Sequence, residues 1–141
     1  MLIGGYAMGA FGHIRGTNDL DIFINTTDDN ASRMMNACKE YGIPEEEIKK
    51  EMFLVQKMIG IGQPPLRIEL LKKLDAVDFE YAYKRKITKK VDDVLINVIS
   101  MEDLTLLKHS AVKDRDKSRD LEDLMFLKKL KEKMNNKEKK P

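Results

Sequence analysis

The hydrophobic positions of the chain follow two kinds of spacing. Alternating or continuous apolar residues predict strands at 20–25, 53–61, 66–71 and 94–99, with residues 62–65 joining the middle two as a hairpin. Apolar residues three or four apart predict helices at 5–14, from a cap among residues 26–29 to Tyr41, from Ser100 onward, and at 118–134. This order predicts an α/β (α+β) fold, in which a small mixed sheet is flanked by helices and followed by a C-terminal helical pair.

The length of 141 residues predicts a single compact unit with a helical appendage. We expect residues 1–100 to form the α/β core, residues 101–134 to form helices packed on it, and residues 135–141 to form a basic disordered tail. Residues 1–3 are too few for an ordinary strand, yet they lead directly into a glycine turn. The chain therefore begins in the middle of an element, and we expect a helix to precede it.

Composition narrows the class of protein. Hydrophobic residues make up 42% of the chain and charged residues 35%, without a run of 18 apolar residues, so we expect no membrane span. No secretion signal is recognisable, and Cys38, the single cysteine, cannot form an internal disulfide. It lies on the apolar side of a predicted helix, where we expect a core residue rather than a nucleophile. These features predict a cytoplasmic protein.

Charge is distributed unevenly along the chain. Seven lysines and two glutamates give residues 128–141 a local charge of +5, which leaves −3 for residues 1–127 out of a net charge of +2. A lysine-rich end without aromatic residues is typical of a frayed, solvated tail. The alternative is a loose electrostatic contact for RNA or DNA, because phosphate binding needs little beyond positive charge.

The candidate chemistry lies near the N-terminus. Gly4 and Gly5 begin a predicted helix, and Asp19 and Asp21 follow on a predicted strand, where residues two apart share a face. Each feature alone is typical of an ordinary turn or a solvated strand face. Together they indicate backbone N–H groups for a phosphate and two carboxylates that repel one another unless a cation lies between them. Mg²⁺, which prefers oxygen ligands, suits that position.

A third carboxylate is predicted at Glu69. In the segment 66–71, alternation buries Ile68 and Leu70 and sends Glu69 to the opposite face together with Arg67. If this strand neighbours the one that carries Asp19 and Asp21, three carboxylates share a site. Otherwise Glu69 is a solvated strand residue.

These motifs resemble those of the nucleotidyltransferase superfamily typified by DNA polymerase β. The similarity is to its small bacterial branch, which includes the nucleotidyltransferase toxins of type IV, abortive-infection-like toxin–antitoxin pairs. The segments that carry it are 4–7, 15–22, 65–71, 77–79, 99–104 with Lys108, and 119–124. Glu69 stands where relatives often have aspartate.

The resemblance implies an enzyme that moves a nucleoside monophosphate from an NTP, such as ATP, to an acceptor and releases pyrophosphate. It implies two Mg²⁺ ions, with Mn²⁺ as an alternative, held by Asp19, Asp21 and Glu69, and Glu69 as general base. It implies a cognate antitoxin as a partner. The residues that it places on the nucleotide are Gly4, Gly5, Arg15, Thr17, Lys108, Lys113 and Arg115.

Several alternatives stay open at this point. Arg15 is also consistent with pairing to a surface acid, and Asp120 and Asp123 with orienting Lys108 or capping the last helix. The acceptor is RNA, such as a tRNA end, or a partner protein. A small-molecule acceptor, as in antibiotic-modifying nucleotidyltransferases, is a second reading, and a non-catalytic NTP-binding interaction module is a third.

Overall fold

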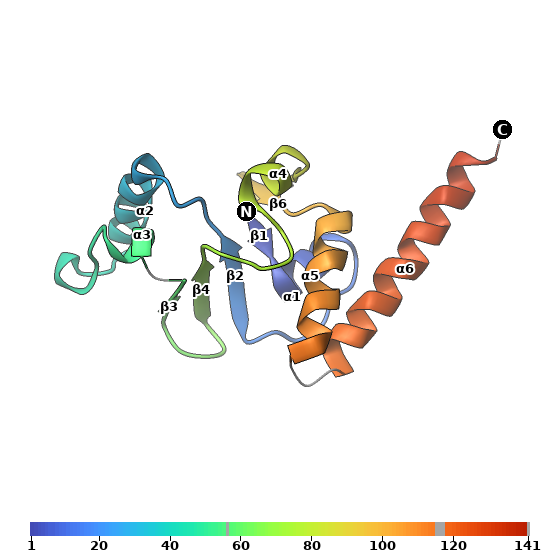
Figure 1. Ribbon diagram of the computed structural model, residues 1–141, viewed down its shortest axis with the longest axis horizontal. Coiled ribbons are helices and arrows are strands. Elements are labelled where there is room, and N and C mark those ends of the chain that lie inside the picture. Colours follow the sequence, from blue (N-terminus) through green and yellow to red (C-terminus); the bar gives the residue numbers. More distant parts are fainter. Residues whose placement is uncertain (56, 115–117, 141) are drawn as a thin grey trace.

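A computed structural model describes residues 1–55, 57–114 and 118–140, and it has an α/β (α+β) architecture (Figure 1). The strands found in this part of the chain are β1 (Leu2–Ile3), β2 (Asp19–Phe23), β3 (Met58–Ile61), β4 (Arg67–Leu71), β5 (Ile87–Val91) and β6 (Val94–Val98). The helices are α1 (Gly4–Ala10), α2 (Asp28–Tyr41), η1 (Glu45–Glu47, a 3-10 helix), α3 (Met52–Val55), α4 (Phe79–Lys84), α5 (Met101–Asp114) and α6 (Ser118–Glu138). The predicted fold class is therefore confirmed.

The strands form one mixed sheet in the order β3-β4-β2-β1-β6-β5. Strand β2 pairs with β4 in parallel and β1 with β6 in parallel, whereas the remaining neighbours are antiparallel. The two strands in the centre are β2 and β1. Strand β2 carries Asp19 and Asp21, and β1 leads directly into the glycine turn of α1. This arrangement places the candidate chemistry in the middle of the sheet.

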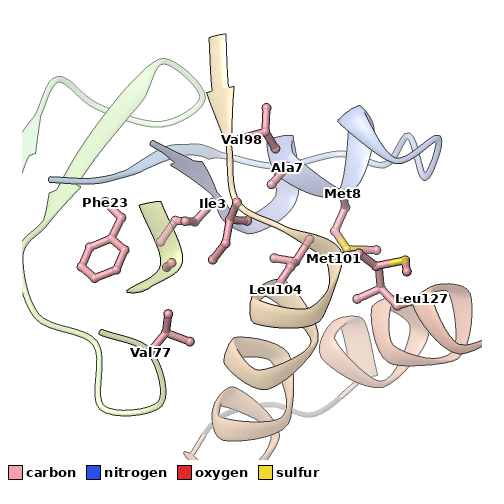
Figure 2. Packing of buried hydrophobic residues seen from close by; sticks show 11 residues of the cluster. Ile3, Ala7, Met8, Phe23, Val77, Val98, Met101, Leu104 and Leu127 are labelled. Atoms are coloured by element: carbon pink, nitrogen blue, oxygen red, sulfur yellow. The ribbon is translucent and has the colours of Figure 1, made fainter. Parts of the chain in front are cut away.

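Two apolar clusters hold the helices against the sheet. The first lies on the face of β2 that carries Phe23 and includes Met8 of α1, Leu104 of α5 and Leu127 of α6. Figure 2 shows Leu127 packing toward Met8 and Met101, which fixes the start of α6 beside α1 and α5. The second cluster lies on the opposite face, where α2 and α3 cover Leu70 and Ile59. Cys38 is buried in this second cluster, as the sequence predicts.

Helix boundaries agree with several local signals. Thr27 caps α2 by accepting a hydrogen bond from the backbone N–H of Asn30, and Gly42 ends the helix with a φ of 97°. The predicted helix at 5–14 is too long, because α1 ends at Ala10 and Gly12 adopts a φ of 95°. Ile14, at the end of the predicted helix, is 91% exposed.

Other expectations are wrong. The first part of the predicted strand 53–61 is the helix α3, because a short apolar run does not distinguish a buried helical turn from a strand. Strand β5 and helix α4 are absent from the prediction: β5 is an edge strand with two lysines, and α4 is too short to show helical periodicity. Helix α6 continues to Glu138, so residues 135–138 are helical rather than part of a disordered tail.

Within residues 1–55, 57–114 and 118–140, no helix is long and apolar enough to cross a membrane. Helix α6 is the longest of the described helices at 21 residues, and it is rich in lysine along its last turns.

Candidate functional site

The candidate site begins with the pairing of β2 and β4. In this parallel ladder Asp21 lies opposite Glu69 and Asp19 lies opposite Arg67. Since residues two apart share a strand face, all four side chains leave the sheet on the same side. The neighbouring strand that Glu69 needs in order to join the aspartates is therefore present.

A pocket of about 400 Å³ opens over this face of the sheet. Its walls come from the glycine turn, the segment that follows α1, the segment after β4, and the helices α5 and α6. The predicted site residues among its lining are Gly4, Gly5, Arg15, Thr17, Asp19, Asp21, Glu69 and Lys108. Eight of the predicted residues thus line a single cavity, although they come from segments more than 100 positions apart in the sequence.

The glycine turn lies directly against the polar residues of the pocket. Gly4 adopts a φ of 68°, and an added Cβ there would overlap the Oδ2 atom of Asp21. A Cβ on Gly5 would lie 3.0 Å from Thr17 Oγ1 and 3.2 Å from Arg15 Nη1. The two glycines are therefore required by space at both positions and by backbone conformation at the first.

Arg15 and Lys108 are held by one buried acid, Asp123 of α6. Arg15 donates to both carboxylate oxygens at 2.8 and 2.7 Å, and Lys108 Nζ lies 2.7 Å from Oδ2. Lys108 also donates to Asp120 at 3.1 Å. His13 completes the group, with Nε2 3.4 Å from Asp123 Oδ1 and its ring stacked on Phe126.

This cluster explains what Asp123 does in the fold. Its side chain is 0% exposed, and burial raises the pKa of its carboxyl. Hydrogen bonds and charges from Arg15 and Lys108 outweigh that effect, so the pKa lies below its ordinary value. Asp123 therefore stays ionised and fixes two cations at the wall of the pocket. Arg15 thus pairs with a buried acid rather than a surface one, and Asp120 and Asp123 both contact Lys108, whereas phosphate binding by these two cations stays a prediction.

The three carboxylates share a face but do not form a preassembled metal centre. Arg67 Nε donates to Glu69 Oε1 at 3.1 Å, so this carboxylate is engaged by a cation of its own strand. Among the described residues, no group of three His, Cys, Asp or Glu side chains is arranged closely enough to hold a metal ion. The donor set itself fits a hard cation, because Asp19, Asp21 and Glu69 supply only oxygen.

One predicted nucleotide ligand, Lys113, is not among the residues that line the pocket. Lys113 is exposed in the last turn of α5, and it points away because the helix faces the pocket through Leu104, Leu107, Lys108 and Ala111. Arg115 lies outside the described residues.

The pocket contains charged residues that the motifs did not predict, namely Lys73, Asp75 and Arg119. Lys73 was accessible to sequence reasoning, since Glu69, Leu71 and Lys73 continue one alternation. Arg119 was not, because its place depends on how α6 packs. Both Lys73 and Arg119 are exposed, and neither has an ion-pair partner among the described residues. They are therefore available to an anion in the pocket.

The chain was also compared with known proteins. No protein-family model and no curated protein matches it. The resemblance to the nucleotidyltransferase superfamily stays a prediction from the motifs.

Proposed function

We propose that this chain is a Mg²⁺-dependent nucleotidyltransferase that moves a nucleoside monophosphate from an NTP to an acceptor hydroxyl. The observation that carries the proposal is the parallel β2–β4 register, which sets Glu69 beside Asp21 in a pocket that the glycine turn borders. Oxygen ligands on one side and backbone without side chains on the other suit a metal-bound triphosphate. The fold class alone would not support this step, since one fold hosts many functions.

In the proposed reaction the acceptor oxygen attacks the α-phosphorus of the NTP. A new phosphorus–oxygen bond forms, the bond from the α-phosphorus to the oxygen that bridges to the β-phosphate breaks, and pyrophosphate leaves. Glu69 takes the proton of the attacking hydroxyl as general base. Mg²⁺, when bound by Asp19, Asp21 and Glu69, neutralises charge on the phosphates and aligns the attacking and leaving oxygens.

The cations of the pocket would do the remaining positioning. Arg15 and Lys108 are kept in place by Asp123, so little freedom is lost when a phosphate binds beside them. Lys73 and Arg119 are exposed at the wall and can turn toward a longer polyphosphate. Alignment and charge neutralisation are the main sources of acceleration in phosphoryl-type transfers.

Calorimetry of NTP binding with and without Mg²⁺ tests the proposal. We expect the variant Asp19→Asn/Asp21→Asn to lose roughly 100-fold or more in Mg²⁺-dependent NTP affinity, because it removes two direct metal ligands. Loss of a residue that only hydrogen-bonds to a metal ligand already lowers metal affinity by about 10–100-fold. The control Asp92→Asn/Asp93→Asn makes the same chemical change in the turn between β5 and β6, and it should bind as the wild type does. Equal affinity in both variants would contradict a metal site at these aspartates.

The finer predictions follow from this proposal. The nucleobase preference, the acceptor and the cognate antitoxin stay predictions, since no contact in the described residues distinguishes among them. The Arg67–Glu69 ion pair favours one alternative, a nucleotide-binding module without catalysis, because Arg67 engages the carboxylate that is expected to act as the general base. Transfer of a labelled nucleotide distinguishes that module from an enzyme.

A further inference from the structure

Helix α6 links the pocket to an exposed basic surface. It begins at Ser118, next to Arg119 on the pocket wall, and projects from the body of the molecule for its last turns (Figure 1). Every residue from 131 to 140 is exposed. With 21 residues at a rise of about 1.5 Å each, the helix is roughly 31 Å long.

Three lysines of this helix lie on the side that Arg119 occupies. Lys137 follows Arg119 by eighteen positions, which is about five full turns, so the two side chains leave the helix in the same direction roughly 27 Å apart. Lys133 lies within about 40° of that direction and Lys129 within about 80°. We call Lys129, Lys133 and Lys137 the lysine row.

The lysine row is free to bind an external anion. All three side chains are exposed, and none has an ion-pair partner among the described residues. The acids Glu132 and Glu138 lie on other sides of the helix, and Glu122 is the acid that separates the row from Arg119. Two further lysines, Lys128 and Lys131, point elsewhere, about 180° and 120° from Arg119.

We propose that the lysine row binds the phosphodiester backbone of a polynucleotide acceptor. Regular positive charge on an exposed helix suits a polyanion, and the absence of aromatic residues from the row predicts binding without sequence preference. The role as acceptor rests on the proposed transferase function, whereas the binding itself does not.

Fluorescence anisotropy with a labelled single-stranded RNA, without NTP or Mg²⁺, tests the row. We expect Lys133→Gln/Lys137→Gln to weaken binding roughly 10-fold and to lower the slope of log affinity against log salt by about 1.4, the value for two lost contacts to a single strand. The matched control, Lys128→Gln/Lys131→Gln, removes the same charge from the other side of the same helix. It should weaken binding less than about 3-fold and leave the slope nearly unchanged. Circular dichroism of both variants should report unchanged helix content.

The outcomes separate the proposal from its competitors. Tighter binding of RNA than of DNA with the same sequence assigns the row to RNA, and equal binding assigns it to the backbone that both share. Equal losses in the two lysine variants would overturn the proposal, because binding would then follow net charge alone. Polyglutamate bound as tightly, with the same dependence on the row, would also overturn it in favour of an acidic protein partner. Because NTP is absent, failure here leaves the transferase proposal untouched, and loss of Mg²⁺-dependent NTP binding leaves the row intact.

Discussion

Replacement of Asp123 with alanine is expected to lower the free energy of unfolding by about 3–5 kcal/mol. Asp123 is fully buried. It accepts hydrogen bonds from Arg15 and forms an ion pair with Lys108, and the side chains of these two residues are only 16% and 9% exposed, respectively. Without the carboxylate, Arg15 loses its ion-pair partner among the described residues and Lys108 keeps only Asp120. The loss is large beside a typical total stability of about 5–15 kcal/mol.

Denaturant unfolding, followed by circular dichroism, measures this loss. Asp93→Ala is the control, since the Asp93 side chain is fully exposed and its nearest cation, Lys90, is 4.0 Å away. That variant should change the free energy of unfolding by less than about 0.5 kcal/mol. A loss below about 1 kcal/mol for Asp123→Ala would contradict the view that the buried acid holds the pocket wall together.

The same carboxylate gives the stability a defined pH dependence. The pKa of Asp123 is lower in the folded protein than its ordinary value of about 3.9, so its ionised form is favoured by folding. Its contribution is therefore complete above that ordinary value and is lost as the pH falls through the folded-state pKa. The difference in unfolding free energy between the wild type and Asp123→Asn should be constant near neutral pH and should shrink in acid.

Glu69→Gln is expected to slow nucleotide transfer by about 10²–10⁴-fold, the usual contribution of a general base. The amide cannot accept the proton of the attacking hydroxyl, and it is a weaker metal ligand than a carboxylate. The control is Arg67→Gln, because it breaks the same 3.1 Å ion pair but keeps Glu69. Measured transfer rates should fall steeply for the first variant and change only a few-fold for the second. Transfer rates that fall equally in the two variants would contradict the general-base role, because the loss would then follow the broken ion pair rather than the missing carboxylate.

Much of the site could be predicted from local patterns. Alternation in β2 places Asp19 and Asp21 on one face, and the glycines mark the start of α1. The pairing of β2 with β4 could not be predicted from spacing alone, because it depends on which strands become neighbours in the sheet. That pairing was therefore left open by the sequence, and the structure shows the two strands as parallel neighbours.

The parts that were missed depend on long-range packing or on weak local signals. Arg15 and Asp123 are 108 positions apart, and their contact exists because Leu127 and Met8 bring α6 against α1. Strand β5 shows little hydrophobic pattern because it is an exposed edge. The end of α6 was mistaken for a tail because its residues are almost all polar, although lysine and glutamate favour helix.

The central claim is nucleotide transfer, and incorporation of label tests it most directly. The purified protein is incubated with a bacterial extract, Mg²⁺ and each nucleoside triphosphate in turn, labelled with radioactive phosphorus at the α position, and the RNA, protein and small-molecule fractions are separated. We predict label in one fraction with the wild type and with Asp92→Asn/Asp93→Asn, and none with Asp19→Asn/Asp21→Asn or without Mg²⁺. Equal labelling by wild type and Asp19→Asn/Asp21→Asn in every fraction would contradict the transferase.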